Sequence, residues 1–123
     1  MLAVGAGGFL GASCRYLAVL GIEAALPRKG AASWPLATLC VNVLGSFVLG
    51  YLLQRSQQME PAQRLFWTTG LLGAFTTFST FSVETLLLWR EGRLAAALGY
   101  VAASVLSGLF FAWLGYRVGA ARL

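Results

Sequence analysis

Four long apolar stretches set the main limit on how this chain of 123 residues can fold. They cover about residues 2–25, 35–53, 65–89 and 94–117, and short polar segments join them. Each stretch has the roughly 20 residues that a helix needs to cross a hydrocarbon core. Because lipid cannot satisfy backbone hydrogen bonds, each stretch is expected to be helical. The sequence therefore predicts an all-α integral membrane protein, with residues 1–123 forming one domain of four transmembrane helices.

The composition supports this class and argues against an enzyme. Hydrophobic residues make up 59% of the chain and charged residues 11%, whereas soluble domains are about half apolar and a quarter charged. The net charge of +5 is spread between the apolar stretches, which favours anchoring at the membrane interface and not nucleic-acid binding. The sequence contains no His and no Asp, and its four Glu lie away from both Cys in sequence. No catalytic pair or metal cluster is therefore predicted.

The charges in the connections carry little information about orientation. With four spans, the N-terminus, the second connection and the C-terminus share one side, with four cations there: Arg55, Arg64, Arg117 and Arg122. The opposite side also has four cations: Arg28, Lys29, Arg90 and Arg93. The positive-inside rule acts on the difference between the sides, and here the difference is zero. This balance predicts dual topology with antiparallel pairing. A single orientation set by the N-terminus or by flanking residues remains the alternative.

The third apolar stretch contains the most unusual segment, residues 70–82. It holds two glycines and five hydroxyl side chains, and no charge occurs before Glu84. Polar groups at membrane depth must face protein or water, so an ion or solute path is the favoured interpretation. Gly70 and Gly73 weaken the helix just before the hydroxyls. A break there would free backbone carbonyls for a small hard cation.

Two faces of this third helix carry candidate functional side chains. Phe78 and Phe81 share one face, and their positively polarised ring edges can stabilise an anion beside Ser79 and Thr80. Ordinary packing is the alternative for the two rings. Glu84 lies on a second face with Thr80 and is expected nearer the vestibule.

The other stretches add four candidates, each with a structural alternative. Arg15 is the only cation within a span, where it either draws anions towards a pore entrance or snorkels to the interface. Asn42 either donates to an anion or joins two helices. Tyr100 and Ser104 either line the path or bond to neighbouring backbone.

Three motifs together resemble the Fluc (CrcB) family of small fluoride channels. They are GxxGAxxRY at residues 8–16, TLxVNxxGSF at residues 38–47 and GxxGxFTTFSTFSxE at residues 70–84. The resemblance covers essentially the whole chain, and the third motif is highly specific. Two features differ from the family pattern. Ala74 follows Gly73 where relatives have a second glycine, and the hydroxyl steps of the fourth helix reach Gly108 and Ala112.

The resemblance implies an antiparallel homodimer with two pores that moves fluoride passively and electrogenically. Such a channel would lower cytoplasmic fluoride from the inner (plasma) membrane of a prokaryotic cell. It also implies a third helix broken at mid-membrane and a structural Na⁺ at the dimer axis, bound by the backbone carbonyls of Gly73 and Thr76. The implied fluoride path consists of Asn42, Phe78, Phe81, Ser79, Thr80, Tyr100 and Ser104, and the implied vestibule residues are Arg15 and Glu84.

Two other functions are considered. A small dual-topology multidrug or cation antiporter would need a membrane-embedded carboxylate in its first helix. Glu23, the only candidate there, lies too near the helix end. A non-conducting membrane assembly subunit would leave the hydroxyl run of the third helix without a purpose.

Overall fold

The computed structural model describes residues 1–26 and 33–121 and is helical throughout its regular elements. Four helical spans in this part of the chain are long and apolar enough to cross a membrane, which confirms the predicted fold class at that level. The third span starts at Pro61, earlier than the sequence suggests. Arg28, Lys29 and Arg122, which enter the charge balance, lie outside the described residues. The elements are α1 (Leu2–Ala25), α2 (Leu36–Arg55), η1 (Ser56–Gln58), α3 (Pro61–Leu65), η2 (Phe66–Leu72), α4 (Gly73–Phe75), α5 (Phe78–Arg90) and α6 (Leu94–Ala120).

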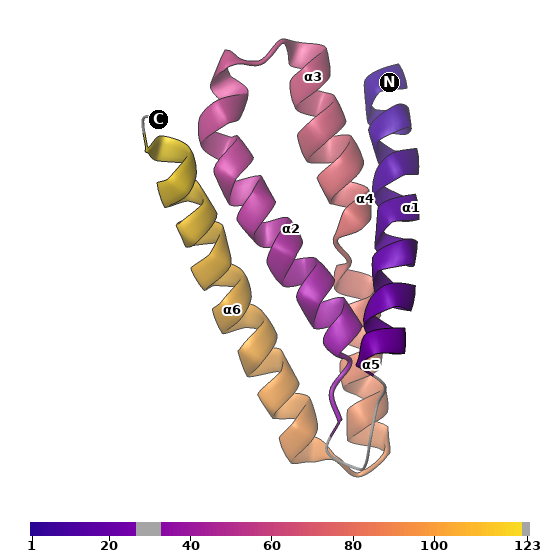
Figure 1. Ribbon diagram of the computed structural model, residues 1–123. Helices are drawn as coiled ribbons and strands as arrows, with labels where there is room; N and C mark the ends of the chain where they lie inside the picture. The colour runs from indigo at the N-terminus through magenta and orange to yellow at the C-terminus, as the bar shows by residue number, and fades with distance from the viewer. Residues whose placement is uncertain (27–32, 122–123) are drawn as a thin grey trace.

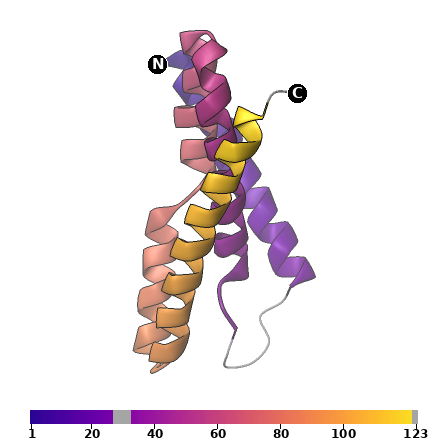
Figure 2. The ribbon, with the colours of Figure 1, turned by 90° about the vertical axis from the view of Figure 1, so that its left-hand side faces the viewer.

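The spans pair differently along the length of the molecule. Helices α2 and α6 pack together, and α1 packs against η2 and α4 of the third span (Figure 1). Beyond α4 the chain shifts sideways, so that α5 packs against α6 while α1 diverges from it (Figure 2). The third span therefore contacts one neighbour with its first half and another with its second half.

Glycines allow the closest of these contacts. A Cβ added at Gly11 of α1 would clash with the backbone carbonyl of Leu71 in η2. A Cβ added at Gly115 of α6 would clash in the same way with the carbonyl of Phe47 in α2. Small residues let membrane helices approach through their backbones. We call these two backbone contacts glycine seams. One fixes α1 against η2, and the other fixes α6 against α2.

The third span has two departures from regular α-helix. Residues Phe66–Leu72 form a π-helical segment, a rare local widening of a helix. Thr76 and Thr77 then adopt extended backbone angles, with φ/ψ of −83°/158° and −150°/115°. We call these two residues the link. The sequence indicated weakness at Gly70 and Gly73, but both glycines are helical. The backbone leaves the helix where side chains replace its hydrogen bonds, as described below.

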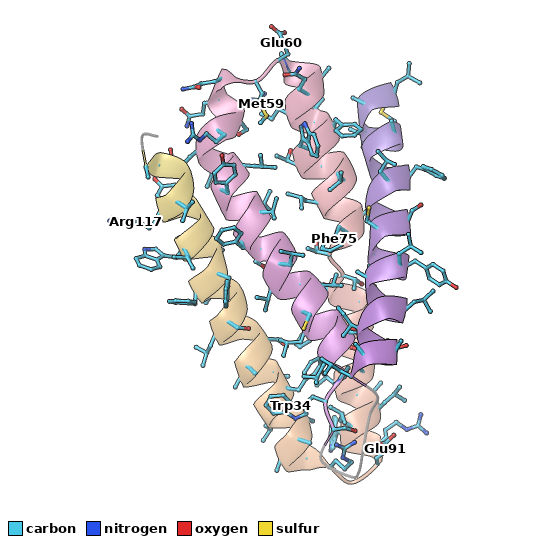
Figure 3. The ribbon with its side chains drawn as sticks, viewed as in Figure 1. Trp34, Met59, Glu60, Phe75, Glu91 and Arg117 are labelled. Atoms are coloured by element: carbon cyan, nitrogen blue, oxygen red, sulfur yellow. The ribbon has the colours of Figure 1, made fainter. Side chains whose placement is uncertain are left out.

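The two ends of the molecule carry its polar connections. Trp34 and Glu91 lie at one end, and Met59 and Glu60 lie at the other, where both chain termini are found (Figures 1 and 3). At the first end Arg93 donates to the carbonyl of Ser33 over 3.0 Å. This bond ties the turn between α5 and α6 to the segment that precedes α2.

Candidate ion path

The link is held by a single side chain from α2. The Asn42 Oδ1 accepts a hydrogen bond from the backbone N–H of Thr77 at 2.8 Å. The Asn42 Nδ2 donates to the backbone carbonyl of the same residue at 3.0 Å. Both backbone groups of Thr77 are thus hydrogen-bonded without a helical partner. This geometry realises the helix-joining role considered for Asn42, and one N–H of its amide is not used by these bonds.

The link removes the helical donors of four backbone carbonyls, those of residues 73–76, and Gly73 and Thr76 are the first and last of these. In an α-helix the Gly73 carbonyl would accept from the N–H of Thr77, and the Thr76 carbonyl from the N–H of Thr80. The first N–H donates to Asn42 and the second donates to the Thr77 Oγ1 at 3.3 Å. Carbonyl oxygens freed in this way suit a small hard cation. The residues proposed as Na⁺ ligands therefore fit such an ion.

The hydroxyl of Thr77 organises the start of α5. It caps this helix by accepting from the Thr80 N–H, and it donates to the Thr80 Oγ1 at 3.0 Å. It also lies 3.4 Å from the Ser79 Oγ. Ser79 and Thr80 are exposed in the single chain. The first turn of α5 therefore presents a cluster of three hydroxyl groups.

Aromatic rings continue from this cluster along α5 towards α6. The centroids of Phe78 and Phe81 lie 5.7 Å apart, and those of Phe81 and Tyr100 lie 5.3 Å apart. Trp34 adds a fourth ring at 6.5 Å from Tyr100. The series runs from an exposed ring to a fully buried one, since Phe78 is 79% exposed and Tyr100 is 0% exposed. The spacing of Phe78 and Phe81 predicts that their rings share one face of α5. Tyr100 lies beside this face because α6 packs on α5.

A carboxylate lies at the inner end of the aromatic series. The Glu84 Oε1 accepts from the Thr38 Oγ1 at 2.9 Å, and its Oε2 accepts from the Tyr100 hydroxyl at 3.0 Å. Thr38 is 4% exposed, so this contact joins three helices in the interior. Hydrogen-bonded acidic groups inside membrane spans mark ion and proton pathways. Glu84 is therefore part of the packed site.

Two cavities meet at the link. One, of about 260 Å³, is lined by Arg15, Glu84, Thr80 and Thr77 among others. The other, of about 240 Å³, is lined by Asn42, Thr76, Thr77 and Phe78 with neighbouring α2 residues. Thr77 lines both. Arg15, although distant in sequence, thus shares a cavity with Glu84.

The hydroxyls of α6 behave differently from one another. The Ser107 Oγ donates to the Ala103 carbonyl of its own helix. The Ser104 Oγ is buried and has no hydrogen-bond partner among residues 1–26 and 33–121. An unpaired buried hydroxyl is costly, so of the two α6 serines it is Ser104 that retains a free hydrogen-bonding capacity.

The structure brings most of the candidate residues into one connected region. Phe78, Phe81, Tyr100 and Glu84 are in direct succession, and Asn42 reaches Thr80 through Thr77. Thr38 was not among the candidate site residues. Its position four residues before Asn42, on the same face of α2, is the sequence signal that could have identified it.

The fold and the site together define a class of protein. The chain is a multi-pass helical membrane protein whose third span carries a contiguous polar and aromatic face. Residues 2–116 match the family of CrcB-like proteins (Camphor Resistance, CrcB). The chain belongs to this family.

Curated relatives are similar over nearly their whole length. The fluoride-specific ion channel FluC of Thermus thermophilus is 44% identical over 122 residues, covering 98% of this chain and 94% of the relative. FluC 1 of Geobacillus kaustophilus is 43% identical, with 96% of each chain covered. FluC of Elusimicrobium minutum is 47% identical, with 93% of this chain and 88% of the relative covered. All three relatives are named as ion channels, and none is named as an enzyme.

Proposed function

We propose that this protein is a fluoride-selective channel that exports fluoride passively and electrogenically and so lowers cytoplasmic fluoride. The relatives are named fluoride-specific ion channels, which supports fluoride as the transported ion. The observation that carries the proposal is the continuous face from the Thr77 hydroxyl cluster through Phe78 and Phe81 to Tyr100. This face offers hydrogen-bond donors and ring edges at a depth where hydrocarbon offers none.

The chemistry of this face suits a small, strongly hydrated anion. Fluoride must exchange its water for donors of comparable strength, yet it must not be trapped by a fixed cation. Hydroxyl groups, the remaining N–H of Asn42 and the edges of two phenylalanine rings are all neutral donors. Arg15, at the cavity that it shares with Glu84, supplies a positive potential at the entrance and not in the narrow path. In this proposal fluoride then passes Ser79 and Thr80 and leaves by Tyr100 and Ser104.

The working unit of the proposed channel is an antiparallel homodimer with two pores, in the inner membrane of a prokaryotic cell. The zero charge difference between the two sides supports insertion in both orientations. The 79% exposure of Phe78 in the single chain leaves its ring available to a second copy. In a Cys14→Ser/Cys40→Ser background, a cysteine replacing the exposed Glu60 should react with an impermeant thiol reagent from both sides. Labelling from one side alone would contradict dual topology.

The proposal includes a structural Na⁺ between the two copies, at a break in the third span near mid-membrane. The carbonyls of Gly73 and Thr76 would hold it, and their displaced helical donors support this assignment. When bound, the ion would compensate the partial negative charge of carbonyl oxygens that have lost their helical donors.

A membrane-potential measurement separates the proposed channel from the alternative, a small dual-topology cation antiporter. Purified protein is placed in vesicles with a fluoride gradient and no pH gradient, and a voltage-sensitive dye reports the potential. A channel sets a potential that follows the fluoride gradient. A potential that ignores fluoride, together with proton movement driven by a lipophilic cation, would favour the antiporter.

A further inference from the structure

Asn42 does more at the link than a pore donor needs to do. Its amide oxygen accepts from the Thr77 N–H at 2.8 Å, which is the donor that a continuous helix would direct to the Gly73 carbonyl. Its amide nitrogen holds the Thr77 carbonyl at 3.0 Å. One side chain of α2 therefore occupies both backbone groups of Thr77, and the Gly73 oxygen is released from helical bonding as a result.

The next turn of α2 supports the link through a different contact. Gly45 is buried, and a Cβ added to it would clash with the Thr76 Cγ2. The Thr76 hydroxyl is turned the other way and donates to the Leu72 carbonyl at 3.0 Å. The methyl group of Thr76 is therefore seated against the glycine. This contact and the Asn42 bonds fix two successive residues of the link from the same face of α2.

The groups that contact the link also decide which kind of cation its carbonyls can take. In the described residues, the hydrogen bonds of Thr76 and Thr77 involve neutral groups: the Asn42 amide, the hydroxyls of Ser79 and Thr80, the Thr80 N–H and the Leu72 carbonyl. Tight sites for divalent ions normally include carboxylate ligands. Neutral carbonyl oxygens alone are better matched to a monovalent ion, because they do not compensate a second charge.

We infer that Asn42 is a positioning residue for the cation site, which keeps the Gly73 carbonyl free by binding the Thr77 amide in its place. This inference rests on the proposed function, in which the carbonyls of Gly73 and Thr76 bind Na⁺. It joins the fluoride path to the cation site through a single side chain. Loss of the amide oxygen lets the Thr77 N–H return to the Gly73 carbonyl and removes that ligand. Partners of metal ligands affect metal affinity by about 10- to 100-fold.

The test measures the thermal unfolding midpoint of the purified full chain in detergent as Na⁺ replaces N-methylglucamine. A ligand that binds only the folded state raises the midpoint with its concentration, which gives the Na⁺ concentration for half of the effect. We expect Asn42→Leu, which keeps the branched shape of the side chain and loses both bonds, to raise this concentration at least about tenfold. Asn42→Asp retains an acceptor for the Thr77 N–H but replaces the group that donates to the Thr77 carbonyl with a second acceptor, so part of the Na⁺ response should remain. This variant should nevertheless lose fluoride flux, since it places a negative charge on the path.

Matched variants make the result specific. Ser46→Ala removes a hydroxyl that donates to the Asn42 carbonyl within α2 and should leave the Na⁺ response unchanged. Phe81→Ile should lose fluoride flux while keeping the Na⁺ response. An unchanged response in a folded Asn42→Leu protein would overturn the inference, and so would a response lost in Asn42→Asp. If Asn42→Leu does not fold, Gly45→Ala is expected to weaken the response through Thr76, and an unchanged response there would overturn the inference.

The same experiment separates this inference from the channel itself. Wild-type protein that conducts fluoride but shows no stabilisation by Na⁺ would overturn the inference and leave the fluoride channel standing. Wild-type protein that is stabilised by Na⁺ through Asn42 but conducts no fluoride would overturn the channel and leave the positioning role of Asn42 standing.

Discussion

In the first half of the third span, helices meet through their backbones, whereas in the second half they meet through side chains. At residues 61–75 the contact with α1 depends on Gly7, Gly11 and Gly70, where an added Cβ would lie 3.1 Å or less from neighbouring backbone atoms. At α5 the contact with α6 and α2 consists of stacked rings and of hydrogen bonds to Glu84. The link, Thr76–Thr77, separates the two modes of packing.

The two halves of the third span are therefore suited to different roles. Backbone contacts at glycines leave little freedom and offer no side-chain donors, so the first half is suited to hold the link in place. Hydroxyls, rings and a carboxylate can exchange partners, so the second half is suited to contact an ion. The side shift of the chain at the link allows both halves to belong to one span.

The largest effect is expected where the backbone seam is disturbed. Gly11→Ala should destabilise the protein by about 3 kcal/mol, since a Cβ there overpacks against the Leu71 backbone. Gly8→Ala, one turn away, is the matched control because its Cβ would meet nothing within 4 Å. Thermal unfolding in detergent measures both. Equal midpoints for the two variants would show that the glycine seam does not hold the link.

The next largest effect concerns the aromatic series. Phe81→Ile should reduce fluoride flux about 100-fold, equivalent to about 2.7 kcal/mol in barrier height, because the ring edges that face the path are lost. The control is Phe110→Ile, which removes a ring that stacks on Phe111 and Trp113 in α6. Fluoride efflux from liposomes compares the two. Unchanged flux in Phe81→Ile would exclude this face from the path.

A smaller effect is expected at the buried end of the series. Tyr100→Phe keeps the ring contact with Phe81 but loses the hydroxyl that donates to Glu84. Flux should fall about tenfold, or about 1.4 kcal/mol in barrier height, with the fold retained. Tyr116→Phe, on the exposed part of the same helix, should have no effect. A similar loss in both variants would argue that the two hydroxyls act on stability and not on the path.

The smallest effect is expected at Ser104. Its hydroxyl is buried without a partner in residues 1–26 and 33–121, so Ser104→Ala removes no internal hydrogen bond and should not lower the unfolding midpoint. Flux should fall about threefold, or about 0.65 kcal/mol in barrier height. Ser107→Ala, which removes a hydroxyl that bonds to its own helix, should leave flux unchanged. A lower midpoint for Ser104→Ala with unchanged flux would remove Ser104 from the path.

The four spans could be predicted from the sequence because span length and apolar content are local properties. The position of the link could not be predicted from the sequence. Gly70 and Gly73 indicate the correct region through their low helix propensity, but the backbone leaves the helix at Thr76 and Thr77. That choice depends on a pair of bonds to Asn42, which lies 35 residues away in sequence.

The candidate site shows the same limit. The spacing of Phe78 and Phe81 predicts a shared face, and their rings are adjacent. The partners of Glu84 are not predictable in this way, because Thr38 and Tyr100 reach it only through the packing of α2 and α6 around α5. The sequence predicts two alternative roles for Asn42: it joins two helices, or it donates a hydrogen bond to an anion. Its two bonds to Thr77 establish the first role and leave one N–H for the second.

The most direct test of the account is fluoride efflux from liposomes that contain the purified protein. The vesicles hold potassium fluoride, valinomycin supplies the counter-charge, and an electrode follows external fluoride. The account predicts rapid efflux when valinomycin is added, with no comparable release from matched vesicles that hold potassium chloride. Absence of efflux from folded protein, or equal release of the two halides, would contradict it.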